Sequence, residues 1–307
     1  MLVFSNISPL ARSGILLSIG LFIFGFGDNF IILISNQVSV GQFHFSRSII
    51  ACLAILIFAS ISREQLIPKN WKAVLVRTFF NVVAMLLYFG VIPMMPIAEA
   101  GAGLFTSPIF VLLFSFLIFK EKISLRQFFS FLLGMLGVFL ILGTNFDNLT
   151  LYHVLPVIAG ASYALGAIIT NRYCYDEKPL ALLFCFLIAI GIVGLMVTIW
   201  FTYFPVDDFH LNQAPFIFKS WQKTSAFYWS IIAFLGLSAT LSIYLIIMAY
   251  QICKPSYSAI YEYTYLLSVG FFGWLIWGSV PSFFSFLGII AIIAAGANIA
   301  LIKSKIN

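Results

Sequence analysis

Four ionisable side chains interrupt long apolar stretches of this 307-residue chain: Asp28, Arg47, Glu99 and Glu262. The chain is 62% hydrophobic and only 8% charged, so each of these groups requires a reason to be there. A charge at the centre of a bilayer costs about 2.5–3.5 kcal/mol on insertion scales, and such residues usually face a bundle interior or a wet cavity. They often mark the route of a substrate or an ion, and this pattern therefore predicts transport.

Asp28 and Arg47 are expected at similar depth on two helices that a short loop joins. Two interpretations are open. In the first, they form a structural ion pair in which each charge offsets the desolvation of the other. In the second, the pair opens to admit a charged or zwitterionic substrate, and both residues bind it.

Glu262 stands among tyrosines, of which Tyr257, Tyr261 and Tyr265 are spaced to share one face of a helix. Tyrosines near a membrane surface often belong to an aromatic belt. In the functional alternative, Tyr261 and Tyr265 stack on a planar or cationic ligand. Glu262, a protonatable carboxylate, would then couple substrate exit to proton entry.

A second stripe consists of Asn81, Met85 and Tyr88, at positions i, i+4 and i+7. An amide, a thioether and a phenol suit the wall of a substrate cavity, although asparagine in a membrane helix more often bonds another helix. Tyr163 is a further substrate-binding candidate on the same argument. Glu99, close to a predicted helix start, is expected to snorkel or to be solvated.

The rest of the chain predicts an all-α integral membrane protein with ten transmembrane helices. Uncharged runs recur at the length of about 20 residues that crosses the hydrocarbon, and they lack the alternating pattern of a membrane barrel. The expected helices cover residues 13–34, 40–60, 73–91, 97–119, 125–143, 152–170, 180–201, 228–250, 256–278 and 282–302.

Basic residues predict the orientation of these helices, because cytosolic loops are enriched in lysine and arginine. With Arg47 and Arg77 set aside as lying within or at the edge of helices, one side collects twelve basic residues and the other only Lys219 and Lys223. Both termini are therefore expected in the cytosol, with the protein in the cytoplasmic (inner) membrane.

Ten helices divide into two sets of five, residues 1–145 and 146–307. Because five is odd, the two sets lie in opposite orientations, as in transporters built from inverted repeats. Residues 96–138 and 255–297 show weak internal similarity: each has a proline before a long helix, a short polar break and a final glycine-bearing helix.

Other classes of function receive less support. The net charge of +6 comes from scattered residues that form no basic stripe, which argues against nucleic-acid binding. The three histidines are far apart, and no phosphate-binding loop is present, so neither an enzyme nor a metal or cofactor is expected. The four cysteines form no CxxC pair and predict no disulfide. A membrane-embedded enzyme and a non-transporting membrane scaffold are the alternatives.

Several motifs resemble the drug/metabolite transporter superfamily, specifically its EamA-like branch. The similar positions are Arg47, residues 105–110 and 119–124, Gly134 and Gly137 in the first half, and residues 261–263, 273–274 and 277–282 with Gly288 in the second. One position departs from the family: Ser279 stands where a glutamate is usual, as at Glu121 in the first half.

This resemblance implies a secondary carrier for a small organic metabolite, such as an amino acid, a nucleoside, S-adenosylmethionine, riboflavin or a sugar. Its partners would be the lipid bilayer, the substrate, and a proton or an exchanged metabolite; its oligomeric state is unknown. The opposite charges of Asp28 and Arg47 and the tyrosines around Glu262 favour a zwitterionic substrate with an aromatic ring.

Overall fold

The computed structural model describes residues 8–95, 97–142, 152, 154–278 and 282–300. Within these ranges every regular element is a helix. In chain order they are α1 (Pro9–Asp28), η2 (Ile31–Leu33), α2 (Val40–Ser62), α3 (Trp71–Val91), η3 (Ile92–Met94), α4 (Ile97–Leu104), α5 (Ser107–Leu117), α6 (Leu125–Leu142), α7 (Val154–Tyr173), α8 (Pro179–Tyr203), α9 (Asp208–Gln213), α10 (Pro215–Phe218), α11 (Ala226–Ile252), α12 (Pro255–Ser258), η6 (Ala259–Tyr263), α13 (Thr264–Trp277) and α14 (Phe283–Ala300).

Local sequence explains where the longest helices begin. Ser39, Asn70 and Ser225 are the N-caps of α2, α3 and α11, and each side chain accepts a hydrogen bond from a first-turn N–H group. Such a cap satisfies a donor that the helix itself leaves free. Pro179 opens α8, at a position where a missing N–H costs nothing. Helix starts in this chain are thus encoded within a few residues.

The outer surface of the bundle is apolar. Large side chains such as Phe58, Phe79 and Phe129 are each more than half exposed, an arrangement that water would penalise and lipid tails do not. Among the described residues, six helical segments are long and apolar enough to cross a membrane. The protein is accordingly a multi-helix membrane protein.

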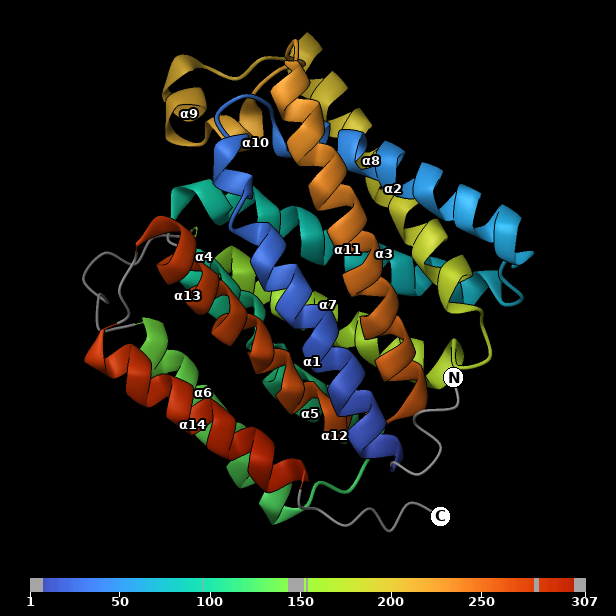
Figure 1. Ribbon diagram of the computed structural model, residues 1–307, viewed down its shortest axis with the longest axis vertical. Coiled ribbons are helices and arrows are strands. Elements are labelled where there is room, and N and C mark those ends of the chain that lie inside the picture. The colour runs from blue at the N-terminus through green and yellow to red at the C-terminus, as the bar shows by residue number, and fades with distance from the viewer. Residues whose placement is uncertain (1–7, 96, 143–151, 153, 279–281, 301–307) are drawn as a thin grey trace.

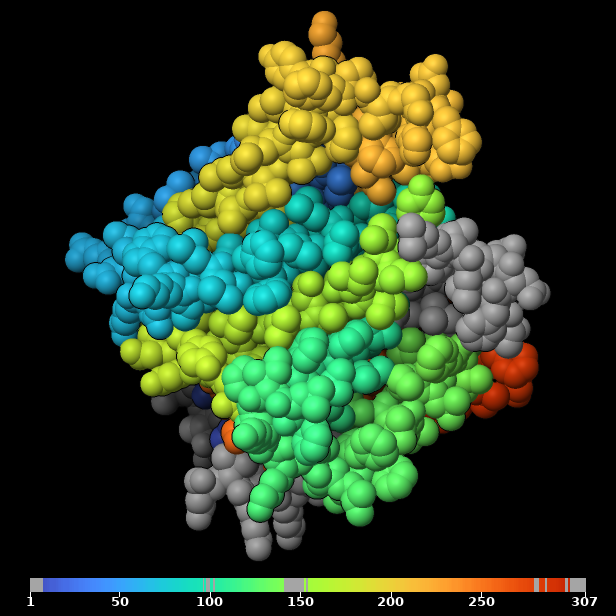
Figure 2. All heavy atoms as spheres, turned by 180° about the vertical axis from the view of Figure 1, so that it is seen from behind, coloured from blue at the N-terminus to red at the C-terminus, as the bar shows by residue number. Residues whose placement is uncertain are grey.

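Pairs of helices distant in sequence make up the bundle. Helix α1 packs against α11 and α13, α2 against α8, and α3 against α7. Helices α6 and α14 pack along one another at one side of the molecule (Figure 1). From behind, α8, α3, α7 and α5 form successive layers (Figure 2). Helices from both halves of the chain therefore contribute to the interior.

The helix expected over 97–119 is broken just before Pro108. Helix α4 ends at Leu104 and α5 begins at Ser107. Pro108 explains the break, because proline lacks an N–H group and its ring clashes with the carbonyl group four residues earlier, that of Leu104. At the break, the Gly103 carbonyl accepts from both the N–H and the hydroxyl of Thr106, at 3.2 Å and 2.7 Å.

The helix expected over 256–278 is also interrupted, so that prediction of a continuous helix was wrong. It consists of α12, a 3₁₀ segment η6 that contains Glu262, and α13. A 3₁₀ helix has three residues per turn rather than 3.6. The common face expected for Tyr257, Tyr261 and Tyr265 is therefore lost, and the two candidate tyrosines have different surroundings.

The connection over 202–227 contains the short helices α9 and α10, which the sequence reading did not predict. Asp207 caps α9 by accepting the His210 N–H at 3.0 Å. That hydrogen bond, with a second one from the His210 ring, lowers the pKa of the Asp207 carboxyl. Residues 279–281, with the family departure at Ser279, and the side chain of Glu99 lie outside the described residues.

Close approach of α2 and α8 depends on glycine. A Cβ atom added at Gly194 would lie 2.6 Å from the Gly41 carbonyl oxygen and 3.2 Å from the His44 Cβ. Gly270 in α13 is the opposite case, because an added Cβ there meets no atom within 4 Å. Small residues that let backbones approach are a common device in membrane bundles.

We expect Gly194→Ala to lower the thermal unfolding midpoint of the purified protein in detergent by about 5 °C, since overpacking typically costs ~1–3 kcal/mol. Gly270→Ala is the matched control and should leave the midpoint unchanged or raise it, because alanine favours helix more than glycine does. Equal midpoints for the two variants would contradict the close packing of α2 on α8.

Candidate functional site

Asp28 is the centre of a buried polar cluster at the end of α1. Its carboxylate accepts hydrogen bonds from the hydroxyls of Tyr88, at 3.0 Å, and Tyr265, at 2.7 Å. The two tyrosine hydroxyls also contact each other. Three expected substrate-binding residues, from α1, α3 and α13, thus meet around one carboxylate.

Glu262 is the centre of a second cluster, which joins the two helix breaks. Its carboxylate accepts hydrogen bonds from the Ser107 hydroxyl at the start of α5 and from the Tyr250 hydroxyl near the end of α11. The side chain is fully buried. Sequence reasoning anticipated Glu262 but neither of its partners, because no local pattern links Ser107 or Tyr250 to it.

Arg47 does not form the expected direct ion pair with Asp28. Both residues are buried and interact electrostatically, but no salt bridge joins them in the described part of the chain. The Arg47 guanidinium instead lies 5.0 Å and 4.8 Å from the ring centroids of Phe43 and Phe89. It also contacts the His44 Nδ1 atom at 3.2 Å. Aromatic faces stabilise a desolvated cation by about 2 kcal/mol, which explains how Arg47 tolerates burial.

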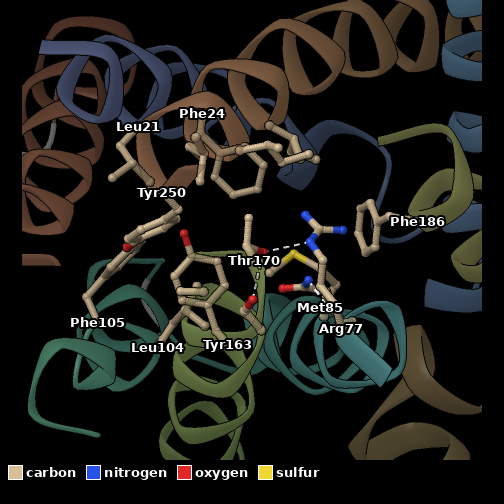
Figure 3. A pocket seen from close by; sticks show the side chains of 16 residues that line it. Leu21, Phe24, Arg77, Met85, Leu104, Phe105, Tyr163, Thr170, Phe186 and Tyr250 are labelled. Atoms are coloured by element: carbon tan, nitrogen blue, oxygen red, sulfur yellow. Dashed lines mark hydrogen bonds between the residues drawn. The ribbon is translucent and has the colours of Figure 1, made fainter. Parts of the chain in front are cut away.

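A cavity lies between helices of both halves of the chain (Figure 3). Its volume of ≈ 50 Å³ is small beside typical small-molecule sites, which measure about 300–1,000 Å³. The lining side chains are mostly apolar, with a few polar groups. They are Leu21, Phe24, Arg77, Asn81, Met85, Leu104, Phe105, Tyr163, Gly166, Ala167, Thr170, Phe186, Ile243, Ile246, Ile247 and Tyr250.

Of the expected substrate-binding residues, Asn81 and Tyr163 line this cavity directly. The two carboxylate clusters border it. Phe24 and Phe105, both lining residues, contact the ring of Tyr265 in the Asp28 cluster, and Tyr250 lies between the cavity and Glu262. Tyr261 is placed elsewhere, with its ring against Gly14 of α1.

Arg77 is the charged residue of the cavity wall that sequence reasoning missed. Its Nε atom donates to the Thr170 hydroxyl at 2.8 Å and its Nη1 atom to the Leu182 carbonyl at 3.3 Å. No described carboxylate forms a salt bridge with it. The sequence does contain a signal for this role, because Arg77 lies one helical turn before Asn81 and Met85 and extends their stripe. Its position near the expected start of a helix suggests a solvated helix edge, but Arg77 is only 4% exposed.

At one end of the bundle, Glu121 holds three segments together. Its carboxylate forms a salt bridge with Arg172 at the end of α7 and accepts a hydrogen bond from the Ser256 hydroxyl of α12 at 3.0 Å. The Arg172 guanidinium also lies 4.1 Å from the ring centroid of Phe119. These contacts give Glu121 an architectural role at this end of the bundle.

A cavity beside a helix break, with two carboxylate clusters at its border, suits a small-molecule site. Comparison with known proteins bears on this directly. Residues 12–143 match the model of the EamA-like transporter family. The match is to this stretch, which makes up most of the first half of the chain.

Two curated relatives match over nearly all of both chains. A Helicobacter pylori protein known only as an uncharacterized transporter is 27% identical over 91% of each chain. The pseudopaline exporter CntI of Pseudomonas aeruginosa is 24% identical over 96% of this chain and 98% of its own. These relatives are transporters, which fits a protein that is not an enzyme.

A solved crystal structure supports the fold independently of sequence. It superimposes with a TM-score of 0.71 over 94% of this chain and 96% of its own, at 13% identity. At that identity the likeness concerns the helix arrangement alone.

We expect Tyr250→Phe to lower the thermal unfolding midpoint in detergent by about 3 °C, because leaving one oxygen of the buried Glu262 without a donor costs ~1–3 kcal/mol. The control is Tyr203→Phe, which removes the hydroxyl of a side chain that is 76% exposed and should leave the midpoint unchanged. If both variants unfold at the wild-type temperature, the Tyr250–Glu262 contact does not stabilise the protein.

Proposed function

We propose that this EamA-like protein is a secondary carrier that moves a small organic metabolite across the cytoplasmic membrane by alternating access. The observation that carries the proposal is the cavity between α1, α3, α4, α7 and α11, flanked by the carboxylates of Asp28 and Glu262. Carriers of this kind bind substrate near the bilayer midplane, at the interface of their repeats and beside discontinuous helices.

We further propose ten crossings in two inverted repeats, residues 1–145 and 146–307. Six crossings are the long apolar segments; the others are α4 with α5, α6, α12 through α13, and α14. The helix pairing supports this arrangement. Two repeats of five crossings make each crossing correspond to the one five places later, so α1 corresponds to α7, α3 to α11, and α4 to α13. The packing of α1 on α11 then corresponds to that of α7 on α3, and the packing of α1 on α13 to that of α7 on α4. All four contacts are present.

The positions of the two broken crossings support the same symmetry. They are the fourth crossing of each proposed repeat, and they touch through the Ser107–Glu262 hydrogen bond. Interrupted helices in corresponding positions of two halves are the best pointer to a binding site in such transporters. Rearrangement at these breaks would open one end of the cavity while the other stays closed.

The proposed orientation has both termini in the cytosol, in accord with the bias of basic residues. In that orientation Glu121, Arg172 and Ser256 close the cytosolic end. The Asp28 cluster closes the opposite end, because α1 runs outwards from its N-terminus.

Coupling is proposed to come from a proton or from an exchanged metabolite. Glu262 is the proposed proton carrier, since intramembrane carboxylates form the proton relays of many transporters. Substrate-binding roles are proposed for Asp28, Asn81, Tyr88, Tyr163 and Tyr265, which line or border the cavity. They are also proposed for Arg47, which interacts electrostatically with Asp28, and for Tyr261 through its aromatic face. The substrate class is a small metabolite of the kind this family carries, and one relative is named as an exporter of pseudopaline.

Counterflow in proteoliposomes tests the carrier directly. Vesicles preloaded with an unlabelled metabolite should transiently accumulate the same labelled compound for at least one member of a panel: S-adenosylmethionine, riboflavin, aromatic and neutral amino acids, and nucleosides. Protein-free vesicles are the control. If no label accumulates although the reconstituted protein is monodisperse, a carrier of this substrate range is contradicted.

A substitution at Glu262 tests the coupling role, with the label that counterflow identifies. Glu262→Gln should reduce accumulation driven by a pH gradient about tenfold or more, because the amide cannot bind and release a proton as a carboxylate does. It should preserve counterflow, because the amide oxygen can accept from one of the two hydroxyls, Ser107 and Tyr250, while the amide NH₂ donates to the other. The control, Glu64→Gln, removes the partially exposed carboxylate of a salt bridge with Lys178 and should change neither activity. Unchanged pH-driven accumulation in Glu262→Gln would exclude Glu262 as the coupling residue.

A further inference from the structure

The cavity wall holds a cation whose charge the described residues do not balance. Arg77 is 4% exposed and lines the cavity, and its two recorded side-chain partners, Thr170 and Leu182, are both neutral. The groups that interact with it electrostatically are Cys174, Tyr163 and Cys185, and none of them is a carboxylate. Arg47, by contrast, interacts with Asp28 and has two aromatic rings beside it.

Part of the Arg77 hydrogen-bonding capacity is free. The guanidinium has five N–H donors in a planar fork, whereas the described chain uses only Nε and one donor of Nη1. The Nη2 atom has no recorded partner among the described residues. A planar fork of this kind matches the two oxygens of a carboxylate.

Tyr163 supplies a second group without a partner. Its hydroxyl is buried and makes no hydrogen bond within the described structure. It lines the same cavity and interacts electrostatically with Glu262 and with Arg77. Figure 3 shows Arg77 and Tyr163 rising from the neighbouring helices α3 and α7 into the cavity, with Leu21 and Phe24 on the opposite wall. Because a phenol donates one hydrogen bond, it complements the same anion.

The remainder of the wall limits what the anion is attached to. Leu21, Phe24, Leu104, Phe105 and Ile246 present apolar surface. No aspartate or glutamate is among the lining residues; the carboxylates of Glu262 and Asp28 are already bonded, to Tyr250 with Ser107 and to Tyr88 with Tyr265. The cavity therefore combines one site for negative charge with a broad apolar surface.

The geometry points to Arg77 as the anchor for the carboxylate of the transported molecule, with Tyr163 as a second donor and an apolar or aromatic body in the rest of the cavity. This inference rests on the proposed carrier function and narrows its substrate to a small organic acid. It replaces the Asp28–Arg47 pair with Arg77 as the group that recognises the negative end. Thr170 positions the guanidinium by accepting from its Nε.

The test compares acids with their uncharged counterparts on purified protein. The probes are 3-phenylpropanoate, phenylalanine, 3-phenylpropanamide and phenylalaninamide, each at 10 mM and equal ionic strength. At least one acid should raise the thermal unfolding midpoint by about 3 °C or more, because a ligand that binds only the folded state stabilises it. The matching amide should shift the midpoint by less than a third as much. This arm uses the wild-type protein and does not depend on any variant folding.

Variants then assign the effect to Arg77. Arg77→Gln should weaken acid binding at least about tenfold, because a buried charge pair is removed, and Arg77→Lys should weaken it less. Lys72→Gln, an exposed cation at the start of the same helix, should bind as the wild type does. The inference is overturned if neither acid stabilises the protein, if amides act as well as acids, or if Arg77→Gln keeps wild-type affinity.

Counterflow separates this inference from the carrier proposal. Transport of an uncharged compound, without stabilisation by either acid, would leave the carrier standing and remove the role of Arg77. In the opposite outcome, an acid stabilises the protein through Arg77 but shows no counterflow when labelled. That result would show that the protein binds the carboxylate but does not transport the acid.

Discussion

The cost of placing ionisable groups in hydrocarbon is the constraint on which this structure depends. Each buried charge has to find polar or aromatic partners, and those partners come from other helices. Asp28 draws together α1, α3 and α13, and Glu262 draws together α5, α11 and η6. The apolar faces of these helices could pack in many registers. Only a few of those registers bring each carboxylate within hydrogen-bonding distance of its donors. The polar clusters therefore define the helix arrangement around the cavity.

The same constraint distinguishes buried charges that have aromatic or oppositely charged partners within the protein from a buried charge that has neither. Arg47 is accommodated by Phe43 and Phe89, and Glu121 by Arg172 and Ser256. Arg77 differs because its recorded partners are neutral and it borders empty space. A carrier must bind its substrate and then release it, so a cation left partly unsatisfied inside the protein suits that cycle better than a completed salt bridge.

Helix interruptions give this bundle a means of changing shape. Both broken crossings have their irregular backbone inside the protein, where nearby donors satisfy the carbonyl groups, as the N–H and hydroxyl of Thr106 do for Gly103. They meet at Glu262, so its carboxylate is a contact between two segments able to move relative to one another. A change of charge on that carboxylate would act directly on the contact between these two segments. In the proposed mechanism, this links proton movement to the change of conformation.

The sequence by itself determined the membrane class, the approximate helix positions and most of the polar residues that border the cavity. These properties follow from local features: apolar run length, capping residues such as Ser39 and Asn70, and the rarity of charge in hydrocarbon. Only the tertiary structure decided the partners. It placed Tyr88 and Tyr265 on Asp28, separated Arg47 from it, joined Glu262 to Ser107 and Tyr250, and brought Arg77 into the cavity. The physical reason is that these contacts join residues 60 to 237 positions apart, or residues across a helix break, so they depend on helix packing that no local pattern encodes.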